Sequence, residues 1–111
     1  MESANGEVRN YFIKIGHTLQ RVSAKEIKWI KSEGNYCIIH TTSKKFVVKI
    51  SLARLKEKLP HYFLQVHRSF IIQLDLIENI DLSAGIIHLQ GEEIPIGRRF
   101  KDQLMEHLTL L

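Results

Sequence analysis

The chain has 111 residues, of which 44% are hydrophobic and 25% charged, a composition typical of one globular domain and not of a disordered chain. Its formal net charge of +4 favours an anionic partner, and its single cysteine excludes an intrachain disulfide and suits a reducing compartment. No apolar run approaches the length of a membrane span, and the N-terminus lacks a signal-peptide pattern, so we expect a cytoplasmic domain with no membrane partner.

The N-terminal half is dominated by short alternating segments that predict β-strands. Residues 1–10 look like a linker or a cloning remnant, and the folded domain is expected to span residues 11–111. Alternating apolar and polar residues indicate half-buried strands, and Gly, Asn and Ser between them indicate turns. Strands are predicted at 11–15, 18–22, 27–31, 36–42 and 45–50. In the last of these, Lys45 and Lys49 fall on the solvent side, opposite Phe46 and Val48.

The C-terminal half adds two helical segments to further strands. Residues 51–59 carry leucines at helical spacing after Ser51, a good N-cap residue, and Pro60 ends the run. Residues 100–110 show helical spacing again. Strands are predicted at 70–74, 76–82, 86–90 and 92–96, with a tight connection at 83–85. Because tight turns favour antiparallel pairing, the sequence predicts a mainly β fold of about eight short strands with one or two peripheral helices.

Charged residues are segregated along the sequence. Residues 31–68 contain eight Lys or Arg and two acidic residues, whereas residues 69–93 contain five acidic residues and no Lys or Arg. This pattern predicts a basic and an acidic face, which is the footprint of a polyanion-binding protein. The alternative is that charges grouped in the sequence do not meet in space.

Three predicted loops carry side chains suited to reading DNA. They are the turn at Gly34-Asn35, the segment His67-Arg68-Ser69 and the segment Gly97-Arg98-Arg99. An Asn side chain can bond adenine N6 and N7, and an Arg side chain can bond guanine O6 and N7. The simpler alternatives are that Gly34-Asn35 only supplies a positive φ, that His67 only ties down its loop, and that the arginines are ordinary surface charge.

The other polar residues show no catalytic or metal-binding pattern. The six histidines are scattered without the spacing of a zinc site, and Cys37 lies within a predicted strand, where a thiol is ordinarily core filler. The sequence contains no phosphate-binding loop and no dinucleotide-binding fingerprint. We therefore expect a protein that is not an enzyme and that uses no cofactor or metal.

Four segments, in order and with compatible spacing, resemble the LytTR-type DNA-binding domain. They are residues 30–36, 51–55, 63–72 and 94–100, and the similarity runs from about Tyr11 to the C-terminus. The resemblance implies an elongated stack of mostly antiparallel β-sheets that serves as the output domain of a two-component response regulator. It also implies that loops enter successive major grooves of double-stranded promoter DNA at direct-repeat sites, often with bending of the DNA.

The resemblance also assigns roles to individual residues by position. The candidate base contacts are Asn35, Arg68 and Arg98. The candidates for phosphate contact or positioning are Lys31, Tyr36, Lys45, Lys49, His67, Ser69 and Arg99. Lys31 stands where the family commonly has an acidic residue and Gly97 where it often has a serine, so the preferred DNA sequence does not carry over.

The resemblance leaves the context of the domain open. A receiver domain in the full-length protein and a dimer on DNA are the other expected partners, and the chain is expected to be either an excised output domain or a stand-alone member. The alternative function is a protein-interaction module that binds a partner through strand edges and a basic face. RNA binding is disfavoured because the predicted solvent faces carry few aromatic residues for stacking on bases.

Overall fold

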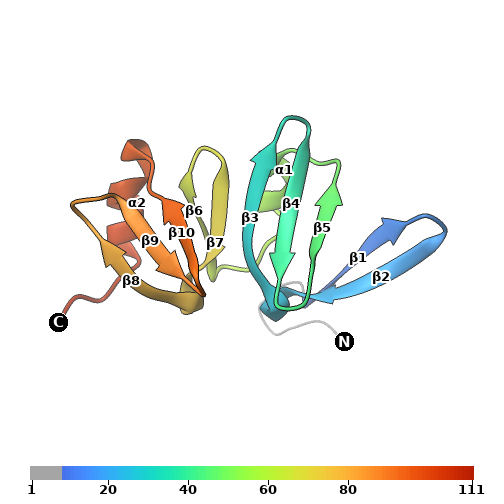
Figure 1. The fold of residues 1–111 in the computed structure, drawn as a ribbon, viewed down its shortest axis with the longest axis horizontal. Helices are drawn as coiled ribbons and strands as arrows, with labels where there is room; N and C mark the ends of the chain where they lie inside the picture. Colours follow the sequence, from blue (N-terminus) through green and yellow to red (C-terminus); the bar gives the residue numbers. More distant parts are fainter. Residues whose placement is uncertain (1–8) are drawn as a thin grey trace.

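The structure is a computed structural model that describes residues 9–111, so the predicted linker lies outside the described residues except for its last two positions. Within this range, ten strands form three sheets (Figure 1). The strands are β1 (Asn10–Ile15), β2 (Thr18–Ser23), β3 (Ile27–Glu33), β4 (Tyr36–Thr41), β5 (Lys45–Val48), β6 (Phe63–His67), β7 (Phe70–Gln73), β8 (Ile77–Asp81), β9 (Ile86–Leu89) and β10 (Glu92–Pro95). The helices are η1 (Ala24–Glu26), α1 (Leu52–Lys56), η2 (Leu74–Leu76), η3 (Arg98–Phe100) and α2 (Lys101–Glu106).

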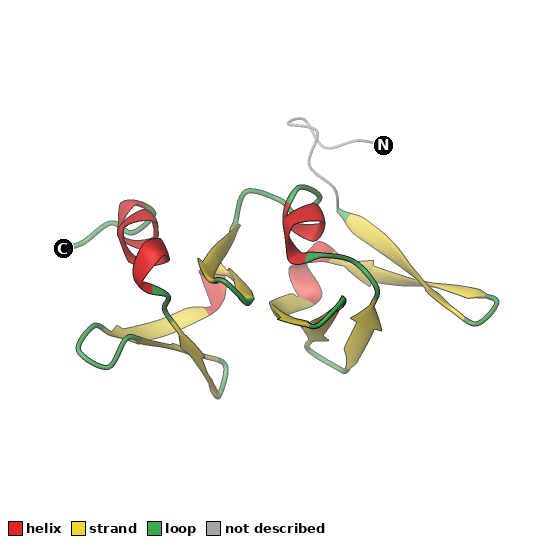
Figure 2. Ribbon diagram, turned by 90° about the horizontal axis from the view of Figure 1, so that it is seen from above, coloured by secondary structure: helices red, strands yellow, loops and turns green. Residues whose placement is uncertain are grey.

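The three sheets follow one another along the long axis of the molecule. A five-stranded central sheet with the order β5-β4-β3-β7-β6 stands between the β1–β2 hairpin and a three-stranded sheet with the order β10-β9-β8. Figure 2 shows α1 beside the central sheet and α2 beside the three-stranded sheet. Every pairing is antiparallel, and the Cα extents are 46 × 34 × 24 Å. The predicted elongated stack of antiparallel sheets is confirmed.

The central sheet separates two hydrophobic cores. On one face, Ile30 and Ile71 pack with Leu52 and Leu55 of α1. On the other face, Trp29 and Ile72 belong to a cluster with residues of the three-stranded sheet and α2. Because successive side chains of a strand point to opposite faces, neighbouring residues such as Trp29 and Ile30 serve different cores. The sheet is therefore held from both sides, which fixes the positions of its loops.

The predicted strands are all present, and the predicted faces of β5 are confirmed. Lys45 and Lys49 are exposed, whereas Phe46 is buried. Both α-helices are shorter than predicted: α1 has five residues and α2 has six. The helix predicted over residues 51–59 is α-helical only to Lys56, because the last turn tightens: the N–H groups of Lys58 and Leu59 donate to the carbonyls of Leu55 and Lys56, three residues earlier.

Strand β6 was not predicted as a separate element. Its residues Phe63, Leu64 and Val66 are all buried. Phe63 packs in one core, while Leu64 and Val66 pack in the other. Buried Leu64 and Val66 alternate with half-buried Gln65 and His67, but Phe63 beside Leu64 interrupts the alternation, and a pattern this short was not assigned to a strand.

Candidate nucleic-acid interface

One edge of the central sheet collects the C-terminal ends of β3, β5 and β6. These strands run in the same direction, because one antiparallel strand separates each from the next. Their C-terminal ends therefore meet at one edge, at the top of Figure 1. We call this surface the loop edge and define it as residues 34–35, 49–51, 67–69 and 97–99.

Two backbone hydrogen bonds join the loops of this edge. The N–H of Ser32, near the end of β3, donates to the carbonyl of Ser69 at 2.9 Å. The N–H of Gly97 donates to the carbonyl of Val66 at 2.8 Å. A Cβ atom built on Gly97 would lie 3.3 Å from the Cα atom of His67, so the loop before η3 packs closely against the end of β6. The three candidate loops are thus parts of one surface.

The first loop presents Asn35 at a two-residue hairpin turn. Gly34 has a φ of 60°, while Asn35 is not among the residues with a positive φ. A positive φ at the first central position is the pattern of a type II′ turn, in which glycine alone meets the steric demand. Asn35 is exposed, and within residues 9–111 its side chain has no hydrogen-bond partner. Its amide is therefore not needed for the turn.

The second loop presents Arg68 on a braced turn. The Nδ1 atom of His67 accepts a hydrogen bond from the N–H of Ser69 at 3.1 Å, and its ring meets Phe70 edge to face at 5.5 Å. The side-chain amide of Gln65 donates to the carbonyl of His67 at 3.2 Å. His67 thus holds the turn, as the simpler alternative for this residue predicts. The exposed Arg68 projects from it.

The third loop places Arg98 and Arg99 on η3, both exposed. Arg98 lines a cavity of about 200 Å³ together with Lys101 and the turn around Ser83. Lys101 is the first residue of α2 and was not among the predicted site residues. The sequence could have indicated Lys101, because it lies two residues after the predicted Arg99.

A groove adjoins the first loop and adds a second residue that the sequence analysis missed. The groove has a volume of about 520 Å³ and is lined by Asn35, Lys49 and Arg54, among others. Arg54 is exposed on α1, where its N–H donates to the N-cap hydroxyl of Ser51 at 3.2 Å. Two cations and an amide therefore face the same groove. The sequence could have indicated Arg54, because it lies in one of the four segments that carry the family resemblance.

The remaining predicted residues divide between the two ends of the sheet. Tyr36 is 45% exposed at the start of β4, and the Nζ atom of Lys31 lies 6.0 Å from the ring centroid of Phe70, so both are near the loop edge. Lys45 pairs with His40 at the other end of β5. At about 3.3 Å per residue, Lys45 stands about 13 Å from Lys49. The structure does not bring Lys45 to the loop edge.

The cations of the loop edge are not neutralised by the protein. Within the part of the chain that the structure describes, Lys49, Arg68, Arg98 and Arg99 form no ion pair. All four are exposed. An unpaired cation at a surface contributes a positive potential that attracts phosphate. Of the bases in residues 31–68 on which a basic face was predicted, Lys49 and Arg68 lie at this edge, whereas Lys45 lies at the other end of β5.

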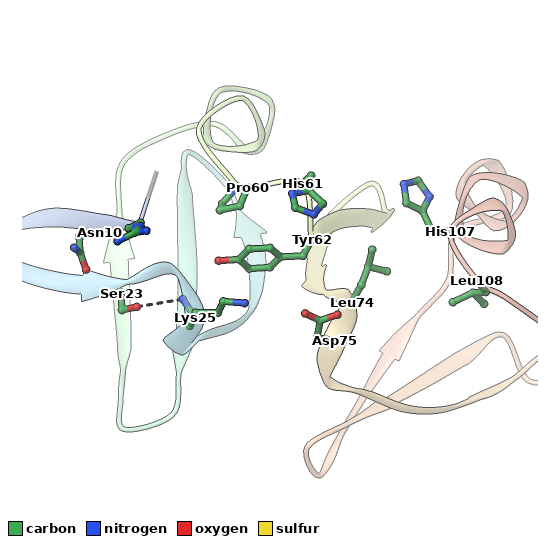
Figure 3. A pocket seen from close by; sticks show the side chains of 11 residues that line it. Asn10, Ser23, Lys25, Pro60, His61, Tyr62, Leu74, Asp75, His107 and Leu108 are labelled. Carbon is green, nitrogen blue, oxygen red and sulfur yellow. Dashed lines mark hydrogen bonds between the residues drawn. The ribbon is translucent and has the colours of Figure 1, made fainter. Parts of the chain in front are cut away.

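A larger cavity lies at the opposite edge of the central sheet. It measures about 960 Å³ and is bordered by Lys25, Tyr62 and Asp75, among others (Figure 3). Some of its polar groups interact with other parts of the fold. The hydroxyl of Ser23 caps η1 by accepting from the N–H of Lys25, and the Nζ atom of Lys25 lies 4.3 Å from the ring centroid of Tyr62. This cavity is not where the candidate residues gather.

Within residues 9–111, no group of three His, Cys, Asp or Glu residues is placed to hold a metal ion. In the same range, no helix is long and apolar enough to cross a membrane.

A rigid β-scaffold that presents unpaired cations and a free amide on successive loops belongs to the class of polyanion-binding domains. Comparison with known proteins identifies the family. The chain belongs to the LytTR family, because the model of the LytTr DNA-binding domain matches residues 17–109. The domain is thus a DNA-binding domain of transcription regulation, as the resemblance predicted.

The named relatives that match this chain in sequence are regulatory proteins. Sensory transduction protein LytR of Streptococcus agalactiae serotype V is 31% identical over 94 residues, which cover 80% of this chain and 38% of the relative. The CO-responsive transcriptional regulator RcoM of Rhodospirillum rubrum is 29% identical, with 84% and 42% covered. Sensory transduction protein LytT of Bacillus subtilis is 26% identical, with 88% and 43% covered. The chain spans about two fifths of the length of these relatives.

A solved structure shares the fold. It is the LytTr DNA-binding domain of a methyl-accepting/DNA response regulator from Bacillus cereus, with a TM-score of 0.78 and 18% sequence identity. The match covers 89% of this chain and 95% of that chain. This likeness confirms the fold class read from the sequence.

Proposed function

We propose that the domain binds double-stranded DNA specifically through the loop edge and reads base edges in two successive major grooves. The observation that carries the proposal is the pair of backbone bonds, Ser32 to Ser69 and Gly97 to Val66, that joins the three loops. The three-stranded sheet and the central sheet, which carry the loops, follow one another along the long axis of the molecule, so the loops can face successive parts of a duplex that lies along this axis.

The roles proposed for the individual residues follow from their exposure and their contacts. Asn35, Arg68 and Arg98 are exposed at the tips of the loops and are proposed to contact bases. Lys49 and Arg54, which face one groove, are proposed to contact phosphates. The same role is proposed for Lys31, Tyr36, Arg99 and Lys101. His67 and Ser69 position Arg68 through their mutual hydrogen bond, and Lys45 is left out of the set.

We further propose that the domain is the output part of a two-component response regulator that acts on direct-repeat promoter sites in the cytoplasm. The support is that relatives covering most of this chain are named sensory transduction proteins. In this proposal a receiver domain belongs to the longer protein and controls how the DNA-binding domain meets promoter DNA, alone or as a dimer.

Selection of duplexes from a random library, followed by footprinting on the enriched sequence, tests specific binding. Protected positions in two grooves about one helical turn apart are expected. A bound pool without an enriched motif would contradict specific reading.

Arginine variants test the assignment of bases. Arg68→Ala and Arg98→Ala should each cost about 1–3 kcal/mol on a duplex with one site and relax the base preference at one position. Arg21→Ala is the matched control, because Arg21 is also exposed but lies on the β1–β2 hairpin. Equal losses in all three variants would show that the arginines act only through total charge.

A further inference from the structure

An apolar cleft of about 290 Å³ opens between the β1–β2 hairpin, the central sheet and α1. In Figure 1 the hairpin extends away from β5, and the cleft lies where the two diverge. The face of the hairpin toward the sheet carries the half-buried Tyr11 and Ile13 and the buried Val22. On the side of α1 the cleft is bordered by Leu55 and Leu59.

The walls of the cleft are apolar. Ten of the twelve described residues that line it have apolar side chains, and its floor reaches core residues such as Ile30 and Ile39, which are 0% and 5% exposed. Protein interiors are close-packed, so an apolar space left open favours an apolar group from outside. A cavity of about 150 Å³ with such a lining holds one benzene molecule, so this cleft has room for about 8–12 carbon atoms.

The cleft has one charged end. Lys58, which follows α1, lines the cleft and is exposed. The hydroxyl of Tyr11 donates to the carbonyl of Lys58 at 2.6 Å and so joins the hairpin to the end of α1. Within residues 9–111 the ammonium group of Lys58 has no ion-pair or hydrogen-bond partner, and none of the described residues that line the cleft is acidic. The group that complements this end is an anion.

We propose that the cleft binds a small carboxylate amphiphile, such as a fatty acid with about 8–12 carbon atoms. Its alkyl chain lies among the apolar walls, and its carboxylate lies beside the Lys58 ammonium. An uncharged apolar molecule would leave Lys58 unmatched, and a cationic one would be repelled. Tyr11 supports the same end, because its bond to the Lys58 carbonyl holds the segment after α1 against the hairpin.

The cleft shares its walls with the groove assigned to DNA phosphates. Ile50 lines both, and Leu55 lines the cleft while its neighbour Arg54 faces the groove. Residues four apart in a helical turn stand about 6 Å apart, which is shorter than the Debye length of about 8 Å. A carboxylate at Lys58 therefore lowers the positive potential at Arg54, so the bound amphiphile weakens DNA binding. This effect on DNA rests on the proposed function, whereas the binding of the amphiphile does not.

Calorimetric titration of the chain with octanoate and decanoate, at concentrations below micelle formation, tests the site without DNA. We expect one molecule per chain and about fourfold tighter binding for each added methylene group, because each buried methylene contributes a constant increment. Decanol, which has the same chain and no charge, should bind about fivefold more weakly than decanoate. In methyl NMR spectra the signals of Ile13, Ile30 and Leu55 should shift on binding.

Two pairs of variants locate the ligand. Lys58→Gln should bind decanoate about fivefold more weakly and decanol as before, whereas Lys56→Gln, which alters an exposed lysine that does not line the cleft, should change neither. Val48→Phe fills the cleft and should abolish binding. Val47→Phe is its control, because Val47 is 62% exposed on the opposite face of β5. Lys58→Gln changes only an exposed side chain, so it decides the site even if Val48→Phe does not fold.

A titration of a one-site duplex with and without decanoate tests the effect on DNA. We expect decanoate to raise the Kd for DNA about fivefold in the unaltered chain and to leave it unchanged in Val48→Phe. Failure of decanoate to bind saturably, or equal binding to Val48→Phe, overturns the site. Decanol that binds as tightly as decanoate overturns the assignment of a carboxylate. Decanoate that binds without changing the Kd for DNA overturns the coupling. If the chain binds no DNA, the proposed function fails and calorimetry still decides the site.

Discussion

Strand β5 offers a matched pair of lysines that tests where DNA lies. Lys49 follows the C-terminal end of the strand and faces the groove beside Asn35, whereas Lys45 begins the strand at the other end. Both side chains are exposed on the same face of the strand. We expect Lys49→Ala to weaken DNA binding and Lys45→Ala to leave it nearly unchanged.

The expected magnitudes follow from the separation of the two lysines. A cation about 4 Å from a phosphate in water contributes about 1 kcal/mol. Lys45 is about 13 Å farther along the strand. That distance exceeds the Debye length of about 8 Å at physiological salt, so its contribution falls below about 0.1 kcal/mol. Each phosphate contact also adds about 0.9 to the slope of log K against log salt.

The assay is a fluorescence titration of a one-site duplex at several salt concentrations. The slope should decrease by about 0.9 for Lys49→Ala and remain unchanged for Lys45→Ala. The same titration on an unrelated duplex should show the same loss for Lys49→Ala, because a phosphate contact carries no base preference. Equal losses for the two variants, or a loss for Lys45→Ala alone, would refute the placement of DNA on the loop edge.

Three further predictions concern stability and reactivity. Burial and the nearby charge of Lys45 lower the pKa of His40, so the folded state binds a proton less readily than the unfolded state. Stability should therefore decline as the pH falls below about 6.5, and urea midpoints of His40→Gln should lack this dependence. Burial raises the pKa of Cys37, and its thiol donates a hydrogen bond to the carbonyl of Ile50. Iodoacetamide should therefore label Cys37 only when the chain unfolds, and rapid labelling of the folded protein would contradict this. A Cβ atom on Gly97 would lie 3.0 Å from the Cδ2 atom of Phe100. Gly97→Ala should therefore destabilise the domain by about 1–3 kcal/mol, measured by chemical denaturation. An unchanged denaturation midpoint would show that the Phe100 ring moves aside without cost.

A strand with a clear alternation could be predicted from the sequence, whereas a short strand with an interrupted alternation could not. In β5 the buried Phe46 stands between the exposed residues Lys45 and Val47, as expected for one buried face. In β6 the buried Leu64 and Val66 alternate with Gln65 and His67, but Phe63 is buried in the other core and interrupts the pattern at the start of the strand. Over five residues such a pattern is too short to assign a strand.

Residues proposed for the site could be named from the sequence, whereas their assembly at one edge could not. Arg68 and Arg98 stand out in the sequence because Arg68 precedes a predicted apolar strand and Arg98 follows another. Their proximity depends on the bond between Gly97 and Val66, which joins segments about 30 residues apart and which no local pattern indicates. Lys45 and Lys49 were both predicted as phosphate or positioning residues, but their shared face of the strand does not reveal that they occupy opposite ends of it.

The bonds that join the three loops also limit how the domain adapts to its target. Loops tied to one another through Ser69 and Val66 cannot change their spacing independently. A mismatch between the spacing of the loops and that of the grooves must then be absorbed by twisting or bending of the duplex. The energy of that deformation depends on the base steps between the contacts. Base pairs that no side chain touches would therefore take part in selecting the site, and stiff spacer sequences should bind less tightly than flexible ones.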